Sequence, residues 1–133
     1  MKSEFNKSWV ASKQPRKQRK FLANAPNHIK RRLLAAHLSK TLKVKYGIRA
    51  IEVRKGDEVK VMRGSFNKKQ GKVATVDTKN TRIQIEGINR TKKDGEKLPV
   101  WFHPSKVLLI KLDDSDKRRL KHIKLKEIKE DKK

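Results

Sequence analysis

The sequence contains no cysteine, which excludes a disulfide framework, a thiolate zinc site and a cysteine nucleophile. It also has no apolar run near the roughly 18 residues that a membrane-spanning helix requires. Residues Met1–Val10 lack the apolar stretch of a secretory signal, so we expect a cytoplasmic protein. No two of the four histidines lie three or four residues apart, the spacing that lets a pair bind one metal ion from a helix. We therefore predict no metal and no cofactor. These histidines are His28, His37, His103 and His122.

Acidic residues are also scarce. The 133 residues include 38 Lys and Arg but only 14 Asp and Glu, which gives a net charge of +24. A free protein of this charge density repels itself, so we expect a polyanionic partner, with nucleic acid as the leading candidate. The excess is greatest in residues 1–56, which carry 16 basic and 2 acidic side chains. Apolar residues concentrate instead between Val53 and Leu112, so a compact core is predicted between two charged extensions.

An enzymatic constellation is missing as well. Asp113, Asp114 and Asp116 could be imagined as magnesium ligands of a nuclease, but an acidic helix N-terminus explains them more simply. No activated nucleophile accompanies them, so we predict a non-enzymatic protein without catalytic residues or a small-molecule substrate. A membrane-surface protein is not expected either, because only residues 29–38 approach an amphipathic helix of the kind it needs.

The first 25 residues are predicted to be a basic arm that is disordered in the free protein. They hold a dense basic stretch from Lys13 to Lys20 and too few apolar residues to offset the entropy of ordering. Pro15 is expected to interrupt any early helix. Trp9 and Phe21 flank the basic stretch, and they either stack on RNA bases or pack on the protein itself.

Residues 26–49 are predicted to form a helical extension. Pro26 suits the first turn of a helix. Four apolar residues follow it at helical spacings, namely Ile29, Leu33, Leu34 and Leu38. After a break, a second short helix is expected between Ser39 as its N-cap and Gly47 as its C-terminal stop.

Residues 50–112 show the two-residue period of β-strands. The apolar pairs Val59 and Val61, Val73 and Val76, and Ile83 and Ile85 are separated by turn-forming residues. Further strands are predicted at Ile88–Arg90, Val100–Phe102 and Val107–Leu112, with a hairpin tip at Asp94-Gly95. Pro99 restricts its strand to an edge or a bulge. Of the adjacent Trp101 and Phe102, which point to opposite faces, one is expected in the core and the other exposed to RNA or to a neighbouring protein. Five or six short strands indicate a small closed β-barrel.

Residues 113–133 are predicted to be a charged tail or a short helix. Leu120, Ile123 and Ile128 could share one face of that helix, although this apolar stripe is thin.

The stretch Arg54–Phe66, followed by Gly71-Lys72-Val73, closely resembles a KOW motif. Physically it is a strand, a glycine-bounded loop and a returning strand. We expect Gly64 and Gly71 to adopt positive φ at the two ends of the loop. The backbone between them could then approach a phosphate, while nearby Lys and Arg side chains supply positive charge.

Further segments make the resemblance more specific: Ser12–Lys20, Asn24–Pro26, Ala36–Lys40, Lys45–Gly47 and His103–Val107. Over residues 8–112 the chain is similar to the archaeal and eukaryotic branch of the universal large-subunit ribosomal protein numbered twenty-four in the bacterial series, and the archaeal form is the closer. We expect the resemblance to end after Leu112. Because transcription elongation factors also contain KOW motifs, the alternative is a free KOW-domain RNA-binding factor of the transcription machinery.

This resemblance implies an SH3-like barrel that binds 23S-type ribosomal RNA near its 5′ end. It also implies a role in subunit assembly near the peptide exit tunnel, beside neighbouring large-subunit proteins. Lys and Arg would neutralise phosphates of the folded RNA and release counterions. The predicted RNA-binding residues are Lys13, Arg16, Lys17, Arg19, Lys20, Lys30, Arg31, Arg32, Arg54, Lys55, Arg63, Lys68, Lys69, Lys72 and Lys106.

Overall fold

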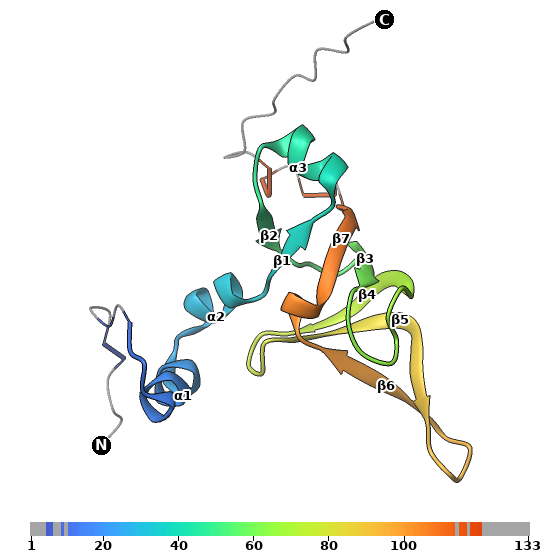
Figure 1. Cartoon of the computed structure of the whole chain (residues 1–133), viewed down its shortest axis with the longest axis horizontal. Helices are drawn as coiled ribbons and strands as arrows, with labels where there is room; N and C mark the ends of the chain where they lie inside the picture. The colour runs from blue at the N-terminus through green and yellow to red at the C-terminus, as the bar shows by residue number, and fades with distance from the viewer. Residues whose placement is uncertain (1–4, 7–8, 10, 114, 117, 121–133) are drawn as a thin grey trace, which may run out of the picture.

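The computed structural model of the chain describes residues 5–6, 9, 11–113, 115–116 and 118–120 (Figure 1). The described part is a mixed α/β fold dominated by strands. Its helices are α1 (Pro15–Asn24), α2 (Asn27–Leu33) and α3 (Lys40–Tyr46). Its strands are β1 (Ala35–Leu38), β2 (Ala50–Glu52), β3 (Glu58–Val61), β4 (Gln70–Asp77), β5 (Arg82–Thr91), β6 (Lys97–Phe102) and β7 (Val107–Lys111). A 3₁₀ turn, η1 (Pro104–Lys106), precedes β7.

All seven strands belong to one sheet with the order β2-β1-β7-β3-β4-β5-β6. The pairing of β1 with β7 is parallel, with His37 beside Leu108, and the other pairings are antiparallel. β2 and β6 are the two ends of this order, so the described pairings show no closure of the predicted barrel. β6 lies at an edge, as Pro99 predicted.

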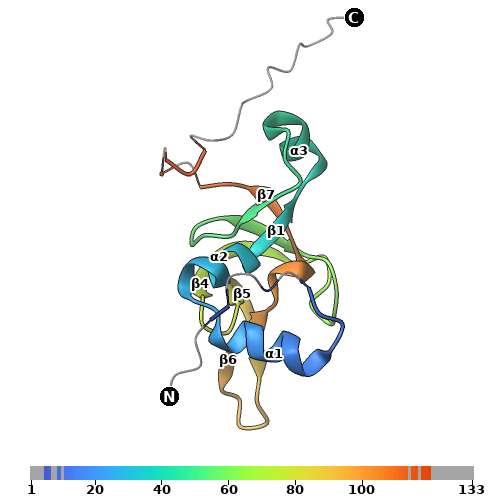
Figure 2. The same cartoon turned by 90° about the vertical axis from the view of Figure 1, so that its left-hand side faces the viewer.

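The basic arm contains a helix, which corrects the expectation for Pro15. This residue is the first of α1 rather than its interruption, because the first turn of a helix does not use the N–H that proline lacks. No residue of α1 is buried. α1 and α2 extend from the sheet on the side away from the tip of the β5–β6 hairpin, and Figure 2 views the molecule from their side. Disorder of residues 1–25 in the free protein stays a prediction.

The helical prediction for residues 26–49 is correct at its two ends and wrong between them. α2 ends at Leu33, and Ala35–Leu38 form strand β1 with Ala36 and Leu38 buried. The second helix is confirmed as α3. Its N-cap Ser39 accepts a hydrogen bond from Leu42 N at 3.4 Å, and Gly47 closes it with φ of +66°.

The predicted strands are present, but the one predicted at Ile83 and Ile85 and the one predicted at Ile88–Arg90 form a single strand, β5. Ile83, Ile85 and Ile88 all lie in the single strand β5 and are all buried. Strict alternation would place Ile88 on the face opposite Ile85. The register between β5 and β6 shifts after Gln84, and Gly87 within this stretch has φ of +76°. The bulge returns Ile88 to the core side.

The buried side chains form one continuous apolar cluster that spans the sheet. It includes Leu34, Leu38, Val59, Val61, Val73, Ile83, Ile85, Ile88, Phe102, Val107 and Leu109. As predicted, only one of two adjacent aromatic residues of β6 belongs to the core: Phe102 is buried and Trp101 is 40% exposed. Within the described chain, no helix combines the length and apolar content needed to cross a bilayer.

The two glycines of the KOW loop differ from each other. Gly64 has φ of +93°, as expected. Gly71 does not have positive φ, which corrects the prediction. It lies so close to β5 that a Cβ atom would stand 2.7 Å from the carbonyl oxygen of Glu86. Gly71 therefore permits close approach of two strands rather than a tight turn.

Candidate nucleic-acid interface

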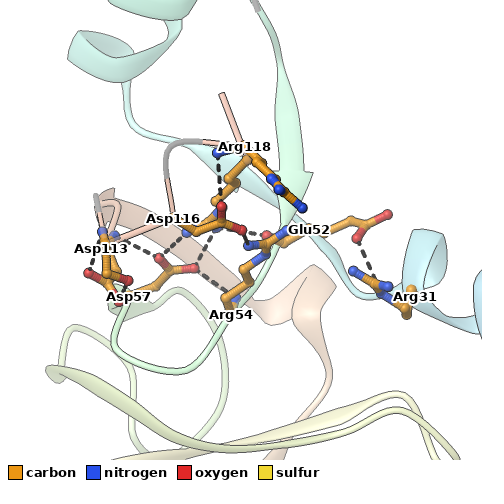
Figure 3. A network of polar contacts seen from close by, with 9 residues as sticks. Arg31, Glu52, Arg54, Asp57, Asp113, Asp116 and Arg118 are labelled. Atoms are coloured by element: carbon orange, nitrogen blue, oxygen red, sulfur yellow. Dashed lines mark hydrogen bonds and ion pairs between the residues drawn. The ribbon is translucent and has the colours of Figure 1, made fainter. Parts of the chain in front are cut away.

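A buried carboxylate, that of Asp57, fixes the start of β3, the first strand of the KOW motif and called the KOW strand below. Arg119 donates Nη1 and Nη2 to its two oxygens at 2.6 and 2.7 Å, and the two side chains are 3% and 0% exposed. The backbone N–H groups of Arg54 and Asp113 donate to the same carboxylate at 2.8 and 3.0 Å. Figure 3 shows Arg54, Asp113 and Asp116 gathered around Asp57. The beginning of β3 is thus tied to the residues that follow β7.

A second, more exposed ion pair joins the same two segments. Nη1 of Arg54 donates to a carboxylate oxygen of Asp116, and this hydrogen bond lowers the pKa of Asp116 below its usual value. Arg54 was a predicted RNA-binding residue, but its guanidinium is engaged within the protein. Arg31, also predicted, lies 3.8 Å from Glu52, with both side chains well exposed (Figure 3). At the surface such a pair is weak, so Arg31 can exchange partners.

Three predicted residues from separate parts of the chain line one hollow. Arg31, Arg54 and Lys55 surround a volume of about 480 Å³ between α2 and β4, together with Glu52 and the threonines Thr75 and Thr78. The structure therefore brings α2 close to the start of the KOW motif. Because Arg54 pairs with Asp116, Arg31 and Lys55 are the lining cations that a phosphate could bind here.

The KOW loop presents its cations to solvent. Arg63, Lys68, Lys69 and Lys72 are all exposed. The loop is closed by backbone hydrogen bonds between Val61 and residues 68–69, both at 2.9 Å. Lys69 Nζ lies 5.3 Å from the ring centre of Phe66, a cation–π contact. The loop is thus a defined backbone turn that carries four exposed cations.

Arg63 and Lys106 meet at a second hollow. It has a volume of about 490 Å³ and lies between the KOW loop, β6 and η1. Trp101, His103 and Arg82 also line it. None of the three was among the predicted RNA-binding residues, although either Trp101 or Phe102 was expected to be exposed to RNA or to a neighbouring protein.

The arm residues form a separate basic surface. Lys13, Arg16, Lys17, Arg19 and Lys20 are all exposed, four of them on α1. Lys30, Arg31 and Arg32 lie in the last turn of α2, where cations complement the helix dipole. The structure does not bring these arm residues together with the KOW loop.

The aromatic residues of the arm pack on one another. The rings of Trp9 and Phe21 stack with centroids 4.3 Å apart, and Phe5 lies tilted at 5.1 Å from Phe21. Of the two alternatives for Trp9 and Phe21, the structure shows packing on the protein itself. Stacking on RNA bases stays a prediction.

Sequence reasoning missed the cations of the β5–β6 hairpin and one buried arginine, Arg119. Arg90, Lys92, Lys93 and Lys97 lie on the β5–β6 hairpin, where residues 89–99 are all exposed. The unbroken polar run between Ile88 and Leu98 was the available signal, because such a run has no apolar face to bury. Arg119 was missed because it lies 62 residues from Asp57, and no local pattern reports so distant a pairing.

The predicted tail falls partly outside the described residues. Leu120 is partly buried against the core, whereas Ile123 and Ile128 lie beyond the described chain, so the predicted helix of residues 113–133 is not tested. Among the described residues, no group of three or more His, Cys, Asp or Glu is placed to hold a metal ion.

Comparison with known proteins identifies relatives. The chain matches the family described as the ribosomal proteins L26 of eukaryotes and L24 of archaea over residues 12–126. This match continues past Leu112, so the expectation that the resemblance ends there is wrong. Three similar proteins are each called large ribosomal subunit protein uL24. That of Sulfolobus acidocaldarius is 50% identical over 117 residues, which cover 88% of this chain and 87% of the relative.

The other two relatives are equally similar. The protein of Korarchaeum cryptofilum is 50% identical over 127 residues, which cover 92% of this chain and 97% of the relative. That of Saccharolobus solfataricus is 51% identical over 110 residues, which cover 83% and 92%.

Proposed function

The chain belongs to the family of archaeal L24 and eukaryotic L26 ribosomal proteins, and from this premise we propose that it binds the ribosomal RNA of the large subunit. It is a structural, non-enzymatic protein of the large ribosomal subunit. This membership favours the ribosomal interpretation over a free KOW-domain factor of the transcription machinery.

The observation that carries the proposal is the exposure of the positive charge. The cations of α1, of the KOW loop and of the β5–β6 hairpin are exposed, and the chain carries a net charge of +24. Most described acidic groups near the KOW strand are occupied, because Asp57 binds Arg119 and Asp116 binds Arg54. The remaining cations are available for phosphates.

The mechanism is electrostatic and geometric. Lys and Arg side chains replace counterions condensed on the RNA, and the released ions supply a salt-dependent free energy of binding. A-form RNA hides its base edges in a deep, narrow groove, so backbone shape dominates recognition. Because α1 and the β5–β6 hairpin extend from the sheet in different directions, one protein molecule can hold RNA segments that are distant from each other (Figure 1).

Three finer parts of the proposal rest on the family resemblance. The sheet curls into an SH3-like KOW barrel, which is consistent with its single apolar cluster. The bound RNA lies near the 5′ end of the 23S-type molecule. The protein contributes to subunit assembly near the peptide exit tunnel, beside neighbouring large-subunit proteins.

Sedimentation of an epitope-tagged full chain in a cell lysate tests the proposal. We expect the protein to comigrate with large ribosomal subunits and to stay bound after a wash in moderate salt. Crosslinking of the purified subunits should then recover RNA from the 5′ region of the large-subunit molecule. A pool that remains at the top of the gradient, or that comigrates with RNA polymerase, would contradict it.

A further inference from the structure

The hollow between the KOW loop, β6 and η1 is lined by an aromatic residue that does not belong to the hydrophobic core. Trp101 is the one aromatic residue among the exposed large apolar side chains of the described part. It lies on the edge strand β6, opposite Gln84 of β5 and on the face away from the core. Phe66 and Phe102, which also line the hollow, meet edge to face with ring centroids 6.0 Å apart. Three aromatic residues thus line the hollow, and Trp101 is the exposed one.

The rim of this hollow carries positive charge only. Arg63 comes from the KOW loop, Arg82 from β5 and Lys106 from η1, while none of the residues that line the hollow is acidic. The other two hollows that collect arginines each include the carboxylate of Glu52. His103 also stands at the rim. The N–H of Ser105 donates to its Nδ1, which leaves Nε2 as the ring nitrogen that can contact a ligand.

An aromatic face within a cationic rim matches the chemistry of one nucleotide outside a helix. A base that is not stacked in a duplex offers a π-face to an indole, and its phosphate offers negative charge to the surrounding cations. A duplex alone cannot fill both roles, because its bases are stacked on one another.

We propose that this hollow is a binding site for an unpaired RNA nucleotide, whose base stacks on Trp101 while Arg63, Arg82 and Lys106 hold its phosphates. The inference rests on the proposed function and makes it more specific. General phosphate contacts position the protein on folded RNA, whereas this site selects a loop, a bulge or a single-stranded segment.

Tryptophan fluorescence of the full chain tests the site. Trp9→Phe removes the other tryptophan and keeps an aromatic ring beside Phe21, so emission then reports Trp101 alone. The probes are a single-stranded ten-nucleotide oligoadenylate, an RNA duplex of the same length and inorganic polyphosphate. We expect saturable quenching by oligoadenylate and binding of polyphosphate without quenching. Arg82→Gln should weaken the affinity for oligoadenylate but leave the quenching at saturation unchanged.

Substitution of the ring gives the second readout. Trp101→Ala should weaken oligoadenylate binding by roughly five- to a hundred-fold, the range for loss of one stacked base, and should leave duplex binding unchanged. Trp101→Tyr should restore most of the affinity because it keeps a ring. Leu98→Ala is the matched control, since Leu98 is also exposed on β6 but does not line the hollow.

Several outcomes would overturn the inference. The first is quenching by polyphosphate as strong as that by oligoadenylate. The second is the same oligoadenylate affinity in the Trp101→Ala and Leu98→Ala variants. The third is a loss of duplex binding in Trp101→Ala as large as its loss of oligoadenylate binding. If Trp101→Ala reduced incorporation into subunits without changing oligoadenylate binding, the hollow would instead hold a protein neighbour. Failure of the proposed function is distinguishable, because then the unmodified chain would not comigrate with large subunits at all.

Discussion

Asp57 is the residue on which the polar contacts at the edge of the core converge. Its carboxylate accepts hydrogen bonds from the Arg119 guanidinium and from two backbone N–H groups. Arg119 also donates to the carbonyl oxygen of Glu52 at 2.8 Å. A fully buried carboxylate is tolerated only when its oxygens are satisfied, so these donors form one unit. The pair ties the KOW strand to the segment after β7.

Removal of one partner should therefore be costly. Arg119→Ala leaves Asp57 as a buried charge without its counterion, and we expect a loss of about 3–5 kcal/mol in the free energy of unfolding. Urea titration measures this loss. Arg118→Ala is the control, because Arg118 is exposed and only its backbone N–H contacts Asp116. Equal effects of the two substitutions would show that the buried pair adds nothing to the fold.

The outer ion pair predicts a dependence on pH. The hydrogen bond from Arg54 holds the pKa of Asp116 below its ordinary value in the folded protein. A carboxyl group with a lowered pKa stabilises the fold above its unfolded pKa, and this contribution disappears as pH falls through the folded value. Asp116→Asn should thus be less stable than the unmodified protein at pH 7, and the difference should shrink below about pH 3.8.

Unfolding by urea between pH 7 and pH 2 measures this difference. Asp94→Asn, at the exposed tip of the β5–β6 hairpin, is the control and should show no comparable trend. A difference between Asp116→Asn and the unmodified chain that stays constant down to pH 2 would contradict the assignment.

At the scale of elements, β4 and β5 approach each other closely at Gly71. An added Cβ would stand 2.7 Å from both the Glu86 carbonyl oxygen and a methyl carbon of Ile85. Gly71→Ala should destabilise the protein by about 1–3 kcal/mol, as expected for overpacking, and a thermal unfolding midpoint checks this.

Gly64 is the matched comparison for Gly71. Its surroundings are open, but its φ is +93°, so Gly64→Ala acts through the backbone alone. Replacement by Asn separates the two causes. Asn tolerates positive φ better than Ala, so Gly64→Asn should be milder than Gly64→Ala. Gly71→Asn should be worse than Gly71→Ala, because the larger side chain meets the same atoms. If Asn were milder than Ala at both glycines, or more harmful than Ala at both, this interpretation would be contradicted.

The KOW loop should serve RNA binding rather than stability. Replacement of its four cations by Gln should leave the thermal midpoint nearly unchanged, since each is exposed. The four are Arg63, Lys68, Lys69 and Lys72. RNA affinity should fall, and the slope of its logarithm against that of salt concentration should become shallower by roughly 3 if all four contact phosphates.

A control quartet separates position from total charge. It replaces four basic residues on and after α3 that are not predicted to bind RNA, namely Lys40, Lys43, Lys45 and Arg49. If both quartets lower the slope equally, net charge governs binding and the loop has no special role.

At the scale of the whole molecule, the folded sheet and the basic arm are separable. α1 buries none of its residues, whereas Ala25 just after it is buried. A deletion of residues 1–24 should therefore leave the unfolding midpoint unchanged. It removes seven basic residues, and if four or five of them bind phosphates, the salt slope should become shallower by roughly 3. An unchanged slope would mean that the arm does not contact phosphates.

Hydrogen exchange of the full chain measures whether the arm becomes ordered when it binds RNA. In the free protein, the amides of α1 should exchange quickly, because an isolated ten-residue helix is marginal in water. In the assembled subunit they should become protected, because phosphates remove the repulsion between its cations. Equal protection in both states would contradict the coupling of order to RNA binding.

The sequence by itself determined the features that depend on local chemistry. Net charge and the absence of cysteine follow from composition alone. α3 was predictable because Ser39 and Gly47 each satisfy backbone groups within their own turn. Strand β3 was predictable because Val59 and Val61 alternate with charged residues, and β4 and β7 were predictable because their apolar residues lie between turn-forming residues. A row of family motifs indicated the family that the comparisons then showed.

Only the tertiary structure decided features in which distant residues compete or meet. Leu34 and Leu38 are four positions apart, a spacing that suits one face of a helix and also one face of a strand. The pairing of Ala35–Leu38 with β7, some seventy residues later, selects the strand. The bulge at Gly87, the approach of Gly71 to β5 and the pairing of Asp57 with Arg119 are of the same kind. Each depends on a neighbour that chain order does not reveal, because burial and contact are settled by the packing of the whole sheet.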